Sequence, residues 1–371
     1  MSGMPEFRDA LPTGPVRGRG AGLNPGNRFE SVRLHVLGEH LDSVASDCPN
    51  GVQVSTRAGR DASRSIVNRV DSPDLKLGWT LNPYRGCEHG CIYCYARPTH
   101  EYLGMSCGLD FETRLVAKHD APELLRRWIE RPSWCGEPIM LSGVTDPYQP
   151  VESELEITRR CLIVCLETRQ PVTIITKSRL ILRDLDVLED LHRHELVHVA
   201  LSITTLDSSL AARMEPRASS PSARLDAVAK VAATGVPVSV MMAPIIPAIN
   251  DHEIPSVLKA ASETGARRAG YVLLRLPYQI KDLFLDWLRR HFPDRAAKVE
   301  SFIRESRGGE LYDPRFFTRQ RGVGPRARQI HETFTLFARR FGVDQEVPPL
   351  RPRIPPPTTP PPSSQLSLFG T

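Results

Sequence analysis

Residues 82–98 of this 371-residue chain read NPYRGCEHGCIYCYARP, and the fold and the chemistry can both be argued outward from this stretch. It contains three cysteines spaced four and three residues apart: Cys87, Cys91 and Cys94. Gly86 and Gly90 precede two of them, and glycine tolerates the positive φ that a chain needs to wrap around a centre. The spacing therefore predicts a loop whose three thiols face one metal centre.

The metal in such a loop is either zinc or an iron–sulfur cluster, because thiolates select these centres. Structural zinc usually takes four protein ligands, often from two separated pairs of cysteines. No second CxxC occurs in the sequence, although His89 or His100 could supply a fourth ligand. A [4Fe–4S] cluster held by three cysteines leaves one iron open to an exogenous ligand. The residues of the loop leave both kinds of site open.

Around this loop, short apolar runs alternate with helix-like stretches from residue 71 to residue 343. The predicted strands are Trp79–Asn82, Pro138–Val144, Val172–Thr176, Val197–Ile203, Val236–Ala243 and Gly270–Leu274. The predicted helices are Ala121–Glu130, Glu154–Arg169, Leu180–Leu191, Pro221–Ala233, Ile254–Thr264 and Ile280–His291, followed by Arg295–Glu305 and Pro325–Phe341. This alternation indicates parallel strands with crossover helices, in a barrel or an open α/β sheet. In either architecture, ligands bind at the C-terminal ends of the strands.

Composition indicates a soluble globular protein, with 40% hydrophobic and 25% charged residues. No stretch approaches the ~18 apolar residues of a membrane span, and the N-terminus lacks the apolar core of a secretory signal. We therefore expect a cytoplasmic protein without membrane contact. Its formal net charge of +5 permits a nucleic-acid partner but does not argue for one.

The two ends of the chain lack this periodicity. Residues 1–30 are rich in Gly, Pro and Arg, and nine of the 28 residues from Asp344 to Thr371 are proline. We expect residues 1–62 to be largely disordered or irregular. Residues 63–343 should form the core with its C-terminal helices, and residues 344–371 a disordered tail.

The cysteine loop and two later motifs resemble the radical S-adenosylmethionine (SAM) superfamily. CxxxCxxC after the first strand of a (β/α) domain is the spacing of that superfamily, and Tyr93 supplies the aromatic residue before the third cysteine. Together with TDPYQPVE at residues 145–152 and PIIPAIND at residues 244–251, the loop is similar to the spore photoproduct lyase-like branch. This branch, also described as DNA repair photolyase-like, consists mostly of uncharacterised bacterial proteins. The resemblance extends from about residue 63 to residue 341.

This resemblance implies an α/β fold, namely a partial (β/α)6 barrel of the radical SAM type with disordered N- and C-terminal tails. It implies that Cys87, Cys91 and Cys94 ligate three irons of a [4Fe–4S] cluster and that SAM chelates the fourth. The enzyme would cleave SAM reductively to a 5′-deoxyadenosyl radical that abstracts hydrogen from its substrate. An electron donor such as a flavodoxin or a ferredoxin would reduce the cluster.

Polar groups after successive predicted strands are candidates for holding SAM. They are Tyr93, Ser142, Gly143, Thr145, Asp146, Lys177, Ser202, Thr204 and Arg217. Gly143 permits close backbone approach, Thr145 and Asp146 could accept from the SAM ammonium, and Lys177 could meet its carboxylate. Ser202 and Thr204 could bind the ribose, and Glu215-Pro-Arg217 places a charged pair near the same edge. Each also has an ordinary structural interpretation: a strand-ending turn, a solvated loop lysine, or hydroxyls that suit a strand.

In spore photoproduct lyase itself, a cysteine outside the cluster returns a hydrogen atom to the substrate radical. Cys107 follows the cluster loop closely and is the candidate for this catalytic role. Cys161 and Cys165 lie four residues apart in an apolar helix, which is typical of packing residues. Because no donor stands out, lesion repair is not carried over from the resemblance.

The proline-rich tail ends in QLSLF, residues Gln365–Phe369. Apolar anchors on a flexible tether are typical of short motifs that dock into grooves. The pentapeptide resembles the peptide through which bacterial DNA polymerases and repair proteins bind the sliding clamp. Alternatively, these side chains fold back onto the core.

Together these observations predict a radical SAM iron–sulfur enzyme whose substrate is a nucleic-acid base in DNA or RNA. One alternative keeps the chemistry and makes the substrate a peptide or a small molecule. Another is a zinc-stabilised scaffold that binds nucleic acid without catalysis.

Overall fold

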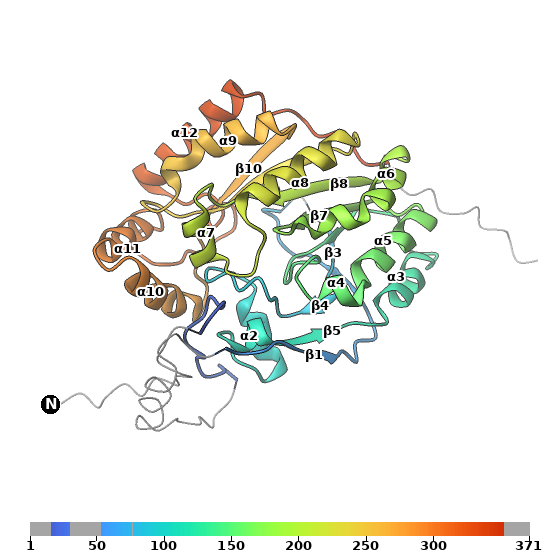
Figure 1. Ribbon diagram of the computed structural model, residues 1–371, viewed down its shortest axis with the longest axis horizontal. Coiled ribbons are helices and arrows are strands. Elements are labelled where there is room, and N and C mark those ends of the chain that lie inside the picture. The colour runs from blue at the N-terminus through green and yellow to red at the C-terminus, as the bar shows by residue number, and fades with distance from the viewer. Residues whose placement is uncertain (1–15, 30–52, 76, 352–371) are drawn as a thin grey trace, which may run out of the picture.

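Seven strands form the main sheet of the protein (Figure 1). They are β2 (Val67–Arg69), β3 (Trp79–Leu81), β6 (Ile139–Leu141), β7 (Val172–Thr176), β8 (Val197–Ser202), β9 (Val238–Ile245) and β10 (Arg268–Leu273). Their order is β10-β9-β8-β7-β6-β3-β2, and all neighbours pair in parallel except β2, which is antiparallel to β3. The structure is a computed structural model that describes residues 16–29, 53–75 and 77–351.

Helices connect the parallel strands and cover the outer side of the sheet (Figure 1). They are α3 (Ala121–Ile129), α5 (Ile157–Glu167), α6 (Leu185–Arg193), α8 (Pro221–Ala233) and α9 (Ile254–Glu263). In α3, the buried residues Ala121, Leu125 and Ile129 recur every four positions, so one face of the helix packs on the sheet. Three helices follow the last strand: α10 (Ile280–His291), α11 (Ala296–Glu305) and α12 (Gly324–Arg340).

The six parallel strands confirm the predicted α/β fold, and their arrangement is consistent with a partial barrel. Two predicted helices are divided in the structure. Glu156 adopts a left-handed φ of 50° and separates α4 (Glu152–Leu155) from α5. The helix predicted from Leu180 begins as the 3-10 helix η2 (Arg179–Asp184) before α6. Helical periodicity alone does not mark such interruptions, because the apolar positions continue across them.

The main sheet remains open, since no pairing joins β10 to β2 in the described part of the chain. A loop after α11 contacts both edges instead. The carbonyl of Gln320 accepts from the Leu273 amide at the end of β10 (2.8 Å). The neighbouring Arg319 donates to the carboxylate of Asp74, which follows β2, at 2.7 Å. The side of the partial barrel is therefore crossed by a loop and an ion pair rather than by paired strands.

A second, three-stranded sheet lies beside the first and supports the cysteine loop. Its strands are β1 (Arg57–Arg60), β5 (Arg114–Ala117) and β4 (Tyr84–Arg85), in the order β1-β5-β4. Short helices flank this region: η1 (Arg97–Leu103), α2 (Asp110–Thr113) and, later in the chain, α7 (Ser208–Met214). These elements are too short for periodicity to indicate them, and the sequence did not predict them.

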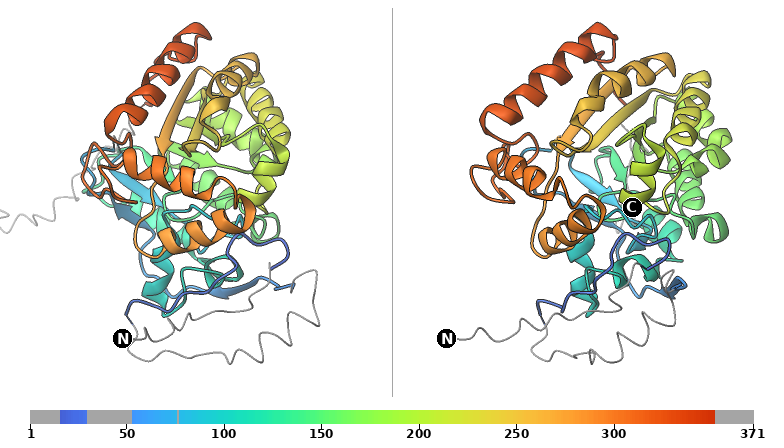
Figure 2. Two further views of the ribbon diagram at one scale, coloured as in Figure 1. Left: turned by 90° about the vertical axis from the view of Figure 1, so that its left-hand side faces the viewer. Right: turned by 60° about the vertical axis from the view of Figure 1, so that its left-hand side comes forward.

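Residues 16–29 contain no helix or strand, but they pack against the core between α2 and α10 (Figure 2). The amides of Gly20 and Ala21 donate to the buried carboxylate of Glu112, at 2.9 and 2.8 Å. The absence of helix and strand from residues 16–29 agrees with the irregular structure expected there, whereas their packing was not predicted. The segment is held by backbone hydrogen bonds, which composition does not reveal. The peptide Gln365–Phe369 lies outside the described residues and stays a sequence prediction.

Candidate active site

The cysteine loop runs from β4 to η1 and turns at two glycines. Gly86 and Gly90 adopt φ values of 77° and 66°. A Cβ on Gly86 would lie 2.9 Å from the carbonyl oxygen of Phe111, and one on Gly90 would lie 2.6 Å from the Glu112 carboxylate. Both positions therefore require glycine, for the backbone conformation and for the close approach of α2.

The fully buried side chain of Arg97 holds this loop in place through hydrogen bonds. Its guanidinium donates to the carbonyl oxygens of Cys91 (2.9 Å), Gly90 (3.2 Å), Cys107 (3.2 Å) and Gly108 (2.8 Å), and to the carboxylate of Glu112 (2.5 Å). A planar guanidinium can serve several acceptors in one rigid geometry. Arg97 therefore fixes the path of the loop at the second cysteine and ties it to residues 107–112.

The three cysteine side chains are free thiols in the interior, with Cys87 and Cys91 buried and Cys94 partly exposed. Burial raises the pKa of the Cys87 thiol, and the charges of Asp146, Cys91 and Cys94 raise it further. In the described ranges, no three His, Cys, Asp or Glu side chains meet around a single ion. A four-iron cluster makes a different demand, because each cysteine ligates a separate iron. Three thiols on one loop, two of them buried and one partly exposed, fit such a cluster.

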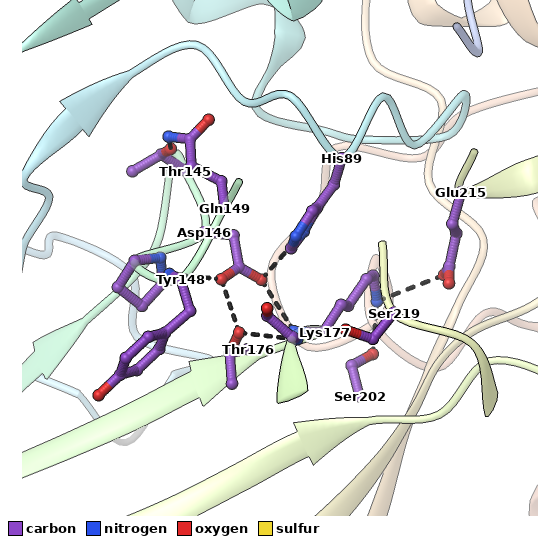
Figure 3. Close-up of polar contacts among 12 residues, drawn as sticks. His89, Thr145, Asp146, Tyr148, Gln149, Thr176, Lys177, Ser202, Glu215 and Ser219 are labelled. Carbon is purple, nitrogen blue, oxygen red and sulfur yellow. Dashed lines mark hydrogen bonds and ion pairs between the residues drawn. The ribbon is translucent and has the colours of Figure 1, made fainter. Parts of the chain in front are cut away.

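At the C-terminal edge of the sheet, Lys177 follows β7 and reaches across to β8 and β9 (Figure 3). Its ammonium donates to the hydroxyl of Ser202 and to the carbonyl of Ala243 (3.3 Å). It lies 3.6 Å from the carboxylate of Glu215 and 5.8 Å from the ring centroid of Tyr93. The structure therefore brings Lys177 together with residues of four other segments, including the cysteine loop.

Glu215, directly after α7, is the centre of this group and is fully buried. Its carboxylate accepts from the hydroxyls of Tyr93 and Thr204 and from the guanidinium of Arg224. Burial alone would raise the pKa of Glu215, but Arg224, Lys177 and the two hydroxyls lower it to about 2. The carboxylate is therefore ionised and faces two cations, which leaves one positive charge of this group without a counterion.

Asp146 follows β6, and its carboxylate is surrounded by protein donors (Figure 3). One oxygen accepts from the Tyr148 amide (2.9 Å) and the Thr176 hydroxyl (2.6 Å), and the other from the Lys177 amide (2.8 Å). The second oxygen also lies 3.3 Å from Nδ1 of His89 in the cysteine loop. Burial raises the pKa of Asp146, but these partners together lower it below its ordinary value. The carboxylate of Asp146 therefore links the end of β7 to the cysteine loop, and both of its oxygens already accept hydrogen bonds from protein groups.

The other residues after β6 also turn toward the cysteine loop. The hydroxyl of Thr145 donates to the carbonyl of Gly86 at 2.7 Å. Ser142 and Gly143 both have positive φ values, 146° and 128°, so the chain bends sharply as the strand ends. The carbonyl of Gly143 accepts from the hydroxyl of Tyr95, which follows Cys94, at 2.7 Å.

Arg217 and Cys107 lie at the periphery of this group. The guanidinium of Arg217 donates to the carboxylate of Glu88 (3.0 Å), and its backbone amide donates to the carbonyl of His89 (3.3 Å). Arg217 therefore stabilises the cysteine loop through two of its residues. Cys107 is completely buried and packs in the same apolar cluster as Cys91 and Tyr93. Burial raises the pKa of its thiol to about 12. Its predicted role as a hydrogen donor stays a prediction.

Two arginines at this site were not found from the sequence. Arg97 follows the third cysteine by three residues. Arg224 lies in α8, and a charged residue in a helix is normally expected to be exposed to solvent. Arg224 is buried because it donates to the carbonyls of Ser202 and Ser219 and to Glu215. The sequence placed Glu215-Pro-Arg217 near this edge of the sheet, but it did not identify Arg224 as the partner of Glu215.

A three-thiol loop at the C-terminal edge of a six-stranded parallel sheet defines a class of cofactor enzymes, and comparison with known proteins identifies the class. Residues 81–261 match the model of the radical SAM superfamily. The uncharacterised protein Rv2578c of Mycobacterium tuberculosis is 33% identical over 244 residues, covering 65% of this chain and 72% of that protein. The chain belongs to the radical SAM superfamily.

More distant similarities extend to a further uncharacterised protein and to solved structures with the same fold. The uncharacterised protein MJ0683 of Methanocaldococcus jannaschii is 28% identical over 191 residues, covering 52% of this chain and 68% of that protein. A solved spore photoproduct lyase variant shares the fold with a TM-score of 0.55 and 16% identity, covering 77% of this chain and 79% of that one. Another variant, solved with bound AdoMet and dinucleoside spore photoproduct, has a TM-score of 0.51.

The protein is therefore a radical SAM enzyme, and its cofactors are a [4Fe–4S] cluster and SAM. Membership of this superfamily rules out the alternative of a non-catalytic zinc-stabilised scaffold. In the described part of the chain, no helix is long and apolar enough to cross a membrane.

Proposed function

We propose that Cys87, Cys91 and Cys94 hold the cluster and that SAM binds beside it, across the ends of β6 to β9. The observation that carries this proposal is the group of Lys177, Glu215 and Arg224, in which Glu215 and Arg224 are buried and the side chain of Lys177 is 15% exposed. It contains two cations and one carboxylate. Unpaired charge in a protein interior is costly, and an anionic ligand near Lys177 would supply the missing negative charge. The carboxylate of SAM has that charge.

The neighbouring residues then act through Lys177 and Glu215 rather than on SAM directly. The hydroxyls of Ser202 and Thr204 are engaged with Lys177 and Glu215, so we propose that they position these two side chains. Tyr93 links the cysteine loop to the same carboxylate. Asp146 and Thr145 hold the loop against β6 and β7. Ser142 and Gly143, at the bent end of β6, remain candidates for direct contact.

When bound, the cluster and SAM supply one-electron cleavage of the sulfonium and a radical that abstracts hydrogen. We propose that the substrate is a nucleic-acid base. A variant of spore photoproduct lyase, which shares this fold, has been solved with bound AdoMet and dinucleoside spore photoproduct. A flavodoxin or ferredoxin is the proposed source of the electron. A peptide or small-molecule substrate is the alternative that the experiments below would reveal.

The proposal is tested by reconstituting the enzyme with iron and sulfide without oxygen, then adding dithionite and SAM. We expect 5′-deoxyadenosine to form, and its yield to rise when DNA or RNA is added. Mass spectrometry of the digested nucleic acid should then detect altered nucleosides. If 5′-deoxyadenosine forms but no nucleic acid is altered or raises its yield, the nucleobase assignment is wrong and the radical chemistry stands.

Replacing Cys91 by alanine should abolish formation of 5′-deoxyadenosine, because one iron loses its protein ligand. The matched control is Cys135→Ala, since Cys135 is an exposed cysteine outside the loop. This control should retain wild-type activity. Equal activity of Cys91→Ala and Cys135→Ala would show that the cluster lies elsewhere.

A further inference from the structure

Exposed aromatic side chains gather beside the cysteine loop. Among the described residues, six aromatic side chains are strongly exposed, and four of them belong to this region. They are Phe29 (60% exposed), Tyr95 (52%), Tyr102 (73%) and Tyr278 (58%). Aromatic side chains normally bury a large apolar area, so four of them on one surface call for an explanation.

Direct contacts join three of these side chains through Arg28, and Arg275 contacts the fourth, Tyr95. The rings of Phe29 and Tyr102 lie 5.2 Å apart. The guanidinium of Arg28 lies 5.1 Å from the ring centroid of Phe29 and 4.0 Å from that of Tyr278. We call the four aromatic residues, together with Arg28 and Arg275, the aromatic row.

The row continues to the cluster loop through Arg275, which follows β10. Its guanidinium lies 5.5 Å from the ring centroid of Tyr95, the residue after Cys94. The segments around residues 275–279 and 95–102 run beside each other, because Gln279 donates to the carboxylate of Glu101 at 2.7 Å. The aromatic row therefore extends from the third cysteine outward to η1.

The base of the row is rigid. Glu101 is buried beneath it and accepts from the backbone amide of Arg28 (3.0 Å) and from its guanidinium (2.6 Å). Asn27 donates to the carbonyl of Glu101 (2.8 Å), which fixes the N-terminal segment on η1. The hydroxyl of Tyr95 is held by the carbonyl of Gly143 (2.7 Å). These contacts hold the rings in place before any ligand arrives.

The chemistry of the row favours a polyanion with flat apolar groups. Arg275 provides positive charge, since Arg28 is paired with the carboxylate of Glu101, and Nε of Arg275 is buried without a hydrogen-bond partner in the described residues. The strongly exposed leucines, Leu75 and Leu336, lie in other segments, so the row offers rings and guanidinium groups rather than an aliphatic surface for a protein. Aromatic rings stack with unpaired bases, while arginines contact the phosphates.

We propose that the aromatic row binds single-stranded nucleic acid by base stacking and so leads a strand to the cluster. A duplex hides the faces of its bases, and therefore the row selects unpaired nucleotides. This inference rests on the proposed function, in which the substrate is a nucleobase, and adds to it the form of the nucleic acid and the residues that hold it.

The test measures fluorescence anisotropy of a labelled oligothymidylate of about 16 nucleotides with the reconstituted enzyme under anaerobic conditions. Tyr102→Ala and Phe29→Ala should each weaken binding about five-fold or more, since stacking on one ring contributes at least that much. Tyr102→Phe keeps the ring and should bind like the wild type. Leu336→Ala, an exposed apolar residue on α12, is the control and should not change binding.

Two further probes separate stacking from charge attraction. An oligonucleotide of the same length with abasic sites should bind more weakly, and a duplex should compete poorly. Binding of the abasic probe as tightly as oligothymidylate would overturn the inference, and so would wild-type binding by Tyr102→Ala and Phe29→Ala. If those variants bind normally while nucleic acid still raises the yield of 5′-deoxyadenosine, only the role assigned to the aromatic row is wrong. If the wild-type enzyme neither binds nor alters nucleic acid, the proposed function fails as well.

Discussion

Replacing Glu215 by glutamine should lower the free energy of unfolding by about 3–5 kcal/mol, the range for breaking a buried ion pair from one side. Arg224 and Lys177 would then remain in the interior without the carboxylate that neutralises one of them. Glutamine is isosteric with glutamate, so the change removes charge without opening a cavity. Urea denaturation of the reconstituted enzyme under anaerobic conditions measures this change in the free energy of unfolding.

The control for Glu215 is Glu167→Gln. Glu167 pairs with Arg126 on the surface, and both side chains are substantially exposed. Such a pair contributes about 0–1 kcal/mol, so this variant should unfold almost like the wild type. The double variant Glu215→Gln/Arg224→Met removes one of the unpaired cations and should recover much of the lost stability. A single variant Glu215→Gln as stable as Glu167→Gln would mean that the buried charges have other counterions.

The same variant also tests the link to SAM. If Glu215 positions Lys177, the glutamine variant should bind SAM more weakly or hold it less productively than the wild type. Equilibrium dialysis with labelled SAM separates this effect from lost stability when it is measured well below the denaturation midpoint. Unchanged SAM binding by folded Glu215→Gln would remove Lys177 and Glu215 from the proposed SAM site.

The sheet could be predicted because its strands carry a strong local pattern. Val172–Thr176, for example, alternates between buried and half-buried positions in the structure, as its β-branched sequence suggests. The cysteine loop could be predicted for a different reason. Its chemistry depends on residues close together in sequence, so spacing alone shows that three thiols can share one centre.

The polar network could be predicted only in part, because its partners come from distant segments. The sequence suggests that Lys177 and Thr204 end strands, but it does not show that both contact Glu215, which follows another helix. Asp146 illustrates the same limit. From the sequence, a carboxylate after a strand is expected to be free to bind SAM. In the structure, its four protein partners come from the cysteine loop, its own turn and the end of β7.

The N-terminal segment shows how backbone contacts escape a reading of composition. Gly20 lies so close to the cysteine loop that a Cβ on it would sit 1.9 Å from the carbonyl oxygen of Gly90. In the sequence, the same glycine looks like one more flexible residue in a Gly- and Arg-rich stretch. Its conformational freedom indicates disorder, while its small size permits the packing that the structure contains.

Replacing Arg97 by methionine should have a second large effect, on the cluster as well as on stability. Four carbonyl oxygens of the cysteine loop and its neighbourhood would lose their donor, and Glu112 would lose its buried cation. Removing one partner of a buried pair costs about 3–5 kcal/mol. We expect the variant to be that much less stable and to bind clearly less iron and sulfide per chain after reconstitution.

Arg97→Lys distinguishes charge from geometry at this position. Lysine keeps the positive charge beside Glu112. Its single ammonium has three donors, however, and cannot reach all the carbonyl oxygens that surround the planar guanidinium of Arg97. If geometry matters, the lysine variant should regain part of the stability and still assemble an incomplete cluster. The surface variant Arg193→Met removes only exposed ion pairs and should have full iron content. Full cluster content in Arg97→Lys would mean that charge beside Glu112 is sufficient. Full content in Arg97→Met would mean that the loop holds its shape without Arg97, and that the cysteines are positioned by Gly86, Gly90 and the contacts of the neighbouring strands.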